Sequence, residues 1–287
     1  SPPILPITPR PMNRIAVCSW SLLPTSVEDL VAKCRACGID GVQLRLDPVR
    51  QWQWRPDEVG GRLRVEGINI VSGMFGPKSE DYSTLETIKA TGGLRPDATW
   101  PDNLKAADGD AIIASRLGAP LVTFHAGFLP HEAGDPERGK LIDRLRQVAE
   151  NFALRNVRTA LETGQESAGT LAALLGELNS ALPARAHVGV NFDPANMILY
   201  GMGDPIAALR ELVPHVLQVH IKDAVPAARP GSWGEERKVG TGAVDWPAFF
   251  RVLREARYAG DYVIERESGD DRVGDVAAAR ELIERQR

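Results

Sequence analysis

Four side chains in this sequence combine residue types and positions that could bind a metal ion. They are Glu162, Asp193, His220 and Glu265, and each of them ends an apolar run of strand length. The runs are rich in β-branched and aromatic residues, which is typical of strands buried in a parallel sheet. Because parallel strands bring their carboxyl ends to the same edge of a sheet, we expect the four side chains to converge.

The chemistry of this set favours one divalent metal ion. Carboxylates and an imidazole suit Mn²⁺, Mg²⁺, Co²⁺ or Zn²⁺, whereas a soft metal or an iron–sulfur cluster would need thiolates. Any one of these carboxylates alone could simply cap the following helix, and a lone histidine is more often a packed imidazole. Buried together, the four groups are costly unless they are paired or bind a metal. The sequence therefore predicts a metalloenzyme.

Strands and helices alternate along the part of the chain that must position these residues. The expected strands are 15–19, 41–46, 68–73, 121–125, 157–162, 188–193, 216–221 and 262–265. The expected helices are 27–37, 56–66, around 106–117, 135–154, 167–182, 205–212, 246–256 and 273–287. This pattern predicts an α/β fold, a single-domain (β/α)₈ TIM barrel with its chemistry at the carboxyl ends of the strands. An open doubly wound sheet is the alternative, but it would normally have a glycine-rich turn after the first strand, and residues 18–22 contain no glycine.

Two segments are expected to differ from the regular barrel. Residues 1–13 are rich in proline and predict an extended N-terminal arm, so the barrel is expected to span 14–287. Residues 76–103 are long and polar and could form a lid, because long irregular loops in compact domains are usually functional or disordered.

The composition narrows the class of partner. With a net charge of −4 and a pI near 5.8, the chain has no basic excess for binding nucleic acid. No apolar stretch approaches the roughly 20 residues of a membrane helix, and no charged-then-apolar leader is present. We therefore expect a soluble protein of the cytoplasm with neither nucleic acid nor membrane as a partner.

The three cysteines are too few for a disulfide framework. Cys34 and Cys37 form a C-x-x-C pair on one face of an expected helix, while Cys18 lies within the first expected strand. Packing in the core is favoured for the pair over redox or metal chemistry, because free cysteine is commonly buried.

Five short motifs occur in order, mostly on successive strands. They are L-E-T at 161–163, N-F-D-P-A-N at 191–196, V-H-I-K-D at 219–223, G-T-G at 240–242 and I-E at 264–265. With these motifs, residues 14–285 resemble the xylose-isomerase-like barrels, which include ketose 3-epimerases, hydroxypyruvate isomerase and inosose-processing enzymes. The motifs are specific for the superfamily and do not identify the substrate.

The resemblance implies that Glu162, Asp193, His220 and Glu265 bind one divalent ion, and that Glu162 and Glu265 also act as acid and base. A metal that chelates a carbonyl and a neighbouring hydroxyl stabilises an enediolate. One carboxylate would remove the proton from the carbon next to the carbonyl. Its return to the other face of that carbon inverts a stereocentre, and its return to the neighbouring carbon moves the carbonyl. One departure is Asn196, because many family members have a histidine there; Asn196 could still hydrogen-bond a substrate hydroxyl.

Further candidates for substrate binding are His125, Lys222, Arg237, Trp20 and Trp100. His125 ends a strand at the same mouth, with a structural hydrogen bond as the alternative. Lys222 could meet a substrate oxygen or pair with a carboxylate, and Arg237 could bind an anion or lie in a surface loop. Trp20 and Trp100 could form an apolar wall against a sugar, although core packing is the commoner role of tryptophan.

The leading functional prediction is a metal-dependent sugar isomerase or epimerase that acts on a small ketose, keto-acid or cyclic polyol ketone. A sugar lyase or dehydratase, working by β-elimination from the same enediolate, is an alternative. A barrel that binds carbohydrate without turning it over is another. Phosphodiester cleavage by a three-zinc barrel ranks lower, because that site needs more histidines than the five in this chain. A homo-oligomer is compatible with the resemblance.

Overall fold

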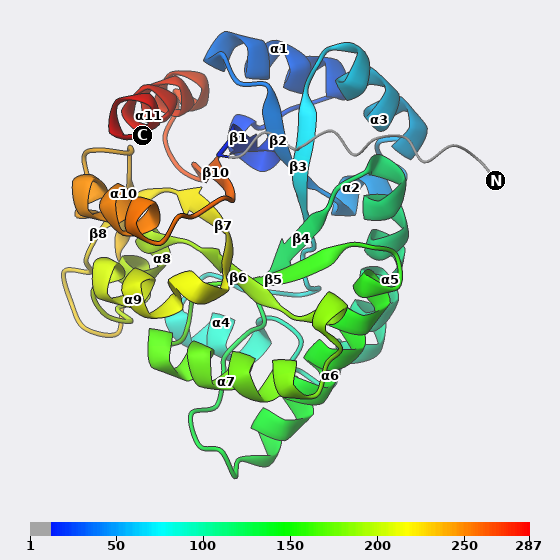
Figure 1. Cartoon of the computed structure of the whole chain (residues 1–287), viewed down its shortest axis with the longest axis vertical. Coiled ribbons are helices and arrows are strands. Elements are labelled where there is room, and N and C mark those ends of the chain that lie inside the picture. Colours follow the sequence, from blue (N-terminus) through cyan, green and yellow to red (C-terminus); the bar gives the residue numbers. More distant parts are fainter. Residues whose placement is uncertain (1–12) are drawn as a thin grey trace.

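Eight parallel strands close into a barrel in the computed structural model, which describes residues 13–287 (Figure 1). The strands, in their order around the barrel, are β1 (Ile15–Cys18), β10 (Asp261–Ile264), β7 (Val216–Ile221), β6 (Gly189–Phe192), β5 (Arg158–Glu162), β4 (Leu121–Phe124), β3 (Asn69–Met74) and β2 (Gly41–Arg45). The ends of each strand lie within one residue of those predicted, so the predicted (β/α)₈ barrel is confirmed. The extended arm predicted for residues 1–13 lies outside the described residues, apart from Asn13.

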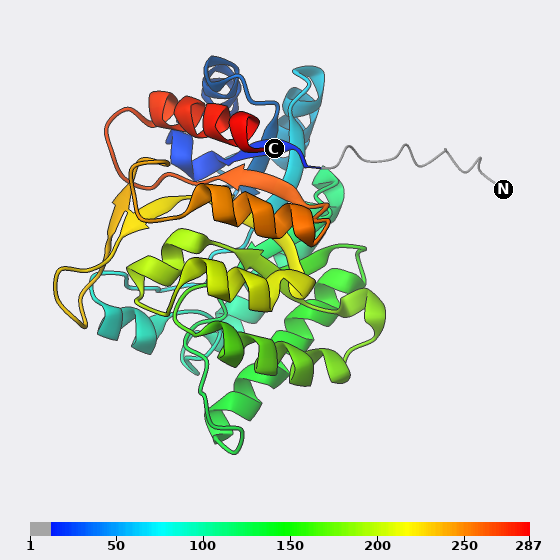
Figure 2. The same cartoon turned by 60° about the vertical axis from the view of Figure 1, so that its left-hand side comes forward.

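Helices surround the barrel (Figures 1 and 2). They are α1 (Val27–Cys37), α2 (Asp47–Arg50), α3 (Pro56–Val65), α4 (Leu85–Thr91), α5 (Trp100–Leu117), α6 (Pro136–Ala153), α7 (Ala168–Ser180), α8 (Pro194–Leu199), α9 (Pro205–Leu212), α10 (Trp246–Glu255) and α11 (Arg272–Gln286). The short helices α2, α4 and α8 are not among those expected from the sequence. Two of these have clear start signals, since Thr84 and Thr87 form a capping box at α4 and Asp193 caps α8. None of the helices in residues 13–287 is long and apolar enough to cross a membrane.

The main hydrophobic core lies between the strands and the surrounding helices. Helix α1 illustrates how it forms: Ser26 caps its start, Gly38 ends it at a φ of 68°, and its apolar face is buried. Cys34 and Cys37 lie on this face with 0% and 1% exposure, and burial raises the pKa of their thiols to about 12 and about 11. Both are therefore protonated packing residues, as the sequence analysis favoured.

A layer of polar side chains crosses the inside of the barrel beneath the strand ends. Gln43 donates to Thr123 Oγ1 at 2.8 Å, and Ser72 donates to Gln218 Oε1 at 2.6 Å. Gln218 in turn donates to Gln43 Oε1 at 3.2 Å and to Asn191 Oδ1 at 3.3 Å. All five side chains are buried. Because buried amides are stable only when they are hydrogen-bonded, the network fixes the orientation of each member.

The segment 76–103 is an ordered part of the barrel mouth that contains α4 and the start of α5. Its backbone is fastened by a hydrogen bond of 3.0 Å from Leu94 N to Ala126 O. The buried side chain of Asn103 accepts the backbone N–H of Lys78 at 2.7 Å. In Figure 2, α4 lies at the same end of the barrel as the loops that follow β7. A lid function for this segment stays a prediction.

Strands β8 (Asp223–Val225) and β9 (Glu235–Arg237) form a separate antiparallel hairpin after β7. The carboxylate of Asp223 accepts hydrogen bonds from the backbone N–H groups of Gly240 and Gly242 and from Trp246 Nε1. A Cβ atom on Gly242 would lie 2.1 Å from Asp223 Oδ1, so this position requires glycine. The G-T-G motif therefore surrounds a carboxylate of its own chain, which accounts for it without a bound phosphate.

Candidate metal centre

The four side chains selected from the sequence meet at the carboxyl ends of β5, β6, β7 and β10. Their nearest ligand atoms all lie within 4.8 Å of one another, and all four residues are buried. Nδ1 of His220 lies 3.3 Å from Glu162 Oε1, 3.5 Å from Asp193 Oδ2 and 3.4 Å from Glu265 Oε2. One nitrogen therefore faces three carboxylate oxygens around a common centre.

The other ring nitrogen of His220 determines which tautomer the imidazole adopts. Its Nε2 lies 2.7 Å from Gln43 Oε1. Asn191 Nδ2 also approaches Nε2, at 3.2 Å, but the shorter contact to an oxygen assigns the proton to Nε2. In the neutral ring Nδ1 then carries the lone pair, which is the form of histidine that binds metals. Burial lowers the pKa of His220, but the surrounding negative charges outweigh this and hold the pKa well above its ordinary value, so a metal would displace a proton from Nδ1.

Two buried polar atoms at this centre are unsatisfied. Within residues 13–287, neither His220 Nδ1 nor Asp193 Oδ2 has a hydrogen-bond partner. Asp193 uses its other oxygen to accept the N–H groups of Ala195 and Asn196 at the start of α8. Because unsatisfied buried polar atoms are rare, their convergence on one point fits a bound cation. The oxygen-rich donor set agrees with a hard divalent ion.

Glu162 and Glu265 have different surroundings. Both oxygens of Glu265 are engaged, because Trp20 Nε1 donates to Oε1 at 2.9 Å and Lys222 Nζ donates to Oε2 at 3.0 Å. Burial raises the pKa of Glu265, but the positive charges of Lys222 and His220 outweigh this and hold the pKa well below its ordinary value. Asn196 Nδ2 donates to Glu162 Oε1 at 3.2 Å, whereas Glu162 Oε2 has no polar partner among residues 13–287.

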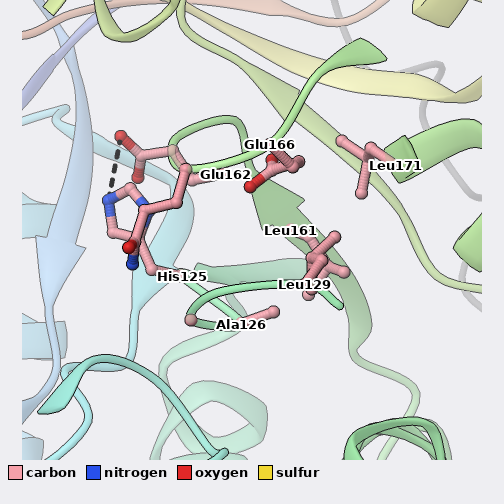
Figure 3. Close-up of a pocket in the computed structure, with 9 residues that line it drawn as sticks. His125, Ala126, Leu129, Leu161, Glu162, Glu166 and Leu171 are labelled. Atoms are coloured by element: carbon pink, nitrogen blue, oxygen red, sulfur yellow. Dashed lines mark ion pairs between the residues drawn. The ribbon is translucent and has the colours of Figure 1, made fainter. Parts of the chain in front are cut away.

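His125 lies beside Glu162 in a small pocket at the end of β4 (Figure 3). Its Nε2 is 3.6 Å from Glu162 Oε1. Burial lowers the pKa of His125, but the negative charges of Glu162 and Glu80 outweigh it and the pKa rises overall. Glu166 lines the same pocket, and burial raises the pKa of its carboxyl to about 7. The pocket, of about 10 Å³, has room for about one water molecule.

A larger cavity of about 740 Å³ opens above the carboxylates. Of the residues proposed from the sequence, it is lined by Trp20, His125, Glu162, Asn196, Lys222 and Glu265. The structure does not bring Trp100 or Arg237 to this cavity. The Trp100 ring packs under the guanidinium of Arg144, 5.1 Å from its centroid, and the exposed Arg237 pairs with Glu235 at 2.8 Å.

The cavity also contains residues that the sequence analysis did not select. The main ones are Glu80, Tyr82, Tyr200, Trp233, Glu236 and Glu267. Tyr200 directly follows α8, and Glu267 lies three residues after β10. The other four residues lie away from the ends of the barrel strands, so their positions in the sequence do not predict that they reach the mouth. Glu267 could have been selected from the sequence, because it lies only two residues after Glu265 at the end of a strand. In the structure its carboxylate accepts a hydrogen bond from Lys222 Nζ at 2.8 Å.

Comparisons with known proteins show the family and the fold of this chain. A family model for the xylose isomerase-like TIM barrel matches residues 31–286. The structure of a xylose isomerase domain protein from Planctomyces limnophilus is 31% identical with a TM-score of 0.84, over 97% of this chain and 98% of that one. A structure of L-ribulose 3-epimerase is 20% identical with a TM-score of 0.73, and the match covers 96% of this chain and 94% of that one. The structure of a xylose isomerase-like TIM barrel protein from Mycobacterium smegmatis, in complex with magnesium, is 18% identical with a TM-score of 0.70. This match covers 94% of this chain and 95% of that one. No curated protein matches the chain.

Proposed function

This chain belongs to the xylose isomerase-like TIM barrel family, and from that premise we propose that it is a divalent-metal-dependent sugar isomerase or epimerase. Its substrate would be a small ketose, keto-acid or cyclic polyol ketone. The observation that carries the proposal is Nδ1 of His220, which faces three carboxylate oxygens at 3.3–3.5 Å at the base of an open cavity.

The proposed ligands of the metal are Glu162, Asp193, His220 and Glu265, with Mn²⁺, Mg²⁺, Co²⁺ or Zn²⁺ as the ion. A bound divalent ion would polarise a substrate carbonyl and neutralise the negative charge that develops on the substrate oxygens. The two unsatisfied atoms of the centre, His220 Nδ1 and Asp193 Oδ2, support this assignment.

Proton transfer is assigned to Glu162 and Glu265, with different parts for the two residues. Glu162 is suited to accept a proton from a substrate carbon, because its Oε2 has no polar partner among the described residues and Asn196 holds its Oε1. Glu265 is held from two sides by Trp20 and Lys222, which fixes its carboxylate at the cavity wall. Return of the proton to the opposite face of the carbon gives an epimer, and its return to the adjacent carbon gives an isomer.

Solvent-deuterium incorporation tests this function. The wild-type protein, loaded with Mn²⁺, is incubated with a panel of ketoses in heavy water, and mass spectrometry follows deuterium bound to carbon. We expect products that have gained deuterium but keep the atoms of the substrate, and Glu162→Gln or Glu265→Gln should slow incorporation about 10²–10⁴-fold at saturating metal.

A matched control is Glu58→Gln, because Glu58 lies on α3 with a side chain that is 68% exposed. This variant should retain the wild-type rate. Undiminished exchange in both carboxylate variants would reject the proposed mechanism. A product lighter than its substrate by water or an alcohol would instead identify a lyase.

A further inference from the structure

The cavity above the carboxylates is larger than a single sugar ring requires. Its volume of about 740 Å³ lies in the upper half of the usual range for small-molecule sites, roughly 300–1,000 Å³. One hexose occupies roughly 200 Å³, if it is counted as six or seven waters of about 30 Å³ each. A ring bound at Glu162 and Glu265 would therefore leave most of the cavity for another part of the substrate.

An aromatic wall extends from the carboxylates into this remaining space. The ring of Tyr200 lies beside the loop after β5, since a Cβ on Gly164 would be 3.6 Å from its Cε2. Trp233 packs edge-on against Tyr200, with ring centroids 4.7 Å apart. Tyr82 stands at the mouth with 45% of its surface exposed. Rings placed in this way suit the apolar face of a sugar.

Trp233 also offers a hydrogen-bond donor that its own chain does not use. Its Nε1 is buried and has no hydrogen-bond partner among residues 13–287. A buried indole N–H usually has an acceptor, because leaving the group unpaired costs free energy. Trp233 lines the cavity, so a small shift of its side chain towards a bound molecule would pair this N–H with one of the molecule's oxygens.

The position of Trp233 is fixed by the hairpin that carries it. The next residue, Gly234, donates its N–H to Leu199 O of α8 at 3.1 Å. On the other side, Glu236 accepts the N–H of Ser268 at 2.7 Å and pairs with Arg266 at 3.1 Å. The hairpin is therefore anchored to α8 and to the loop after β10, both of which contribute residues to the cavity lining.

The charges around the cavity favour a neutral ligand. Six carboxylates line it, from Asp47, Glu80, Glu162, Glu236, Glu265 and Glu267, and the lining cations are Arg45 and Lys222. Lys222 is already paired with Glu265 and Glu267, and Arg45 lies 3.5 Å from Asp47. A phosphate or carboxylate on the distal part of the substrate would be repelled.

We propose that Tyr82, Tyr200 and Trp233 form a second subsite, which binds a neutral sugar unit linked to the ring that reacts at Glu162 and Glu265. The preferred substrate is thus a glycoside or disaccharide whose reacting unit is a ketose, bound more tightly than the free monosaccharide, an inference that rests on the proposed function. The rings contact the apolar face of the second unit, and Trp233 Nε1 donates to one of its oxygens.

Saturation-transfer NMR on Mg²⁺-loaded protein tests the subsite without requiring turnover. The probes are D-fructose and three neutral disaccharides that contain fructose, namely lactulose, turanose and palatinose. We expect at least one disaccharide to bind about tenfold more tightly than fructose or better. Trp233→Phe keeps an aromatic ring but removes the indole N–H donor. It should reduce that preference about 3–10-fold, the effect of one hydrogen bond. Trp233→Ala should remove the preference.

Trp52→Phe is the matched control, because Trp52 is 70% exposed in a different loop and does not line the cavity. This variant should keep the wild-type preference. Equal binding of fructose and all three disaccharides, no binding of any disaccharide, or a preference that survives Trp233→Ala would overturn the subsite. Failure of the proposed function would appear differently, as preferential disaccharide binding without any deuterium exchange.

Discussion

The side-chain oxygen of Gln43 lies 2.7 Å from Nε2 of His220, and this contact decides which imidazole nitrogen faces the three carboxylates. The amide cannot easily turn over, because its Nε2 donates to Thr123 Oγ1 at 2.8 Å and to Gly73 O at 3.3 Å. Gln43, held by its partners inside the barrel, thereby orients the imidazole of His220, a candidate metal ligand. Partners of this kind commonly contribute as much to a metal site as some of its ligands.

Replacing Gln43 with leucine should weaken metal binding about 10–100-fold, because the imidazole loses the acceptor that fixes its tautomer. Isothermal titration of metal-free protein with Mn²⁺ gives the dissociation constant. Gln53→Leu is the control, since Gln53 is exposed and lies outside the interior network. Equal affinities in the two variants would contradict a role for Gln43 in the site.

Purified wild-type protein should contain about one divalent ion per chain after equilibration with Mn²⁺, because a single group of four ligands is expected to hold it. The double variant Glu162→Gln, His220→Ala removes two of these ligands and should lose the ion. Elemental analysis per chain is the measurement, with circular dichroism to check that the variant folds. A wild-type protein without metal under these conditions would favour a barrel that only binds carbohydrate.

The contribution of Glu166 to the stability of the metal-free protein should fall as the pH rises from about 4.5 to about 7. Burial raises the pKa of Glu166 to about 7 from the ordinary 4.5, so the folded state binds more protons than the unfolded state within this window. Glu166→Gln removes the ionising group and should stabilise the protein at pH 8 by about 2–3 kcal/mol relative to wild type.

At pH 4, the wild type and Glu166→Gln should have similar stability, because the carboxyl is then protonated in both the folded and the unfolded state. Urea unfolding in the presence of a chelator, at pH 4 and pH 8, measures the difference. A constant difference between the two proteins at both pH values would contradict the raised pKa.

Gly93→Ala should destabilise the segment 76–103. Gly93 has a φ of 68°, and a Cβ there would lie 2.0 Å from Ala126 O. The clash involves backbone on both sides, so we expect a loss of about 2–4 kcal/mol and a fall in Tm of roughly 5–10 °C. Calorimetry makes the comparison with Gly61→Ala, where a Cβ would meet nothing within 4 Å. A similar Tm for both variants would show that the segment does not depend on this contact.

Local sequence patterns determined the barrel and the ends of its strands. Runs such as 216–221 and 262–265 are apolar and of strand length, and the residues that end or follow them are polar. In a parallel barrel the ends of all the strands meet at one mouth, so the convergence of Glu162, Asp193, His220 and Glu265 could be predicted from their positions along the chain.

Residues in loops could not be placed in the same way, because their direction depends on contacts with distant parts of the chain. Trp100 does not line the cavity, and its ring instead packs against the guanidinium of Arg144 on α6. Arg237 is excluded by the alternation of side chains along β9, where its neighbour Glu236 takes the cavity side.

The sequence by itself thus determined the fold, the convergence of the four candidate ligands and the cavity positions of Trp20, His125, Asn196 and Lys222, all of which lie at or just beyond barrel strand ends. Only the tertiary structure decided which loop residues complete the cavity, among them Trp233 and Tyr82. The reason is physical: the period of a strand fixes the direction of its side chains locally, whereas a loop takes its conformation from the surfaces against which it packs.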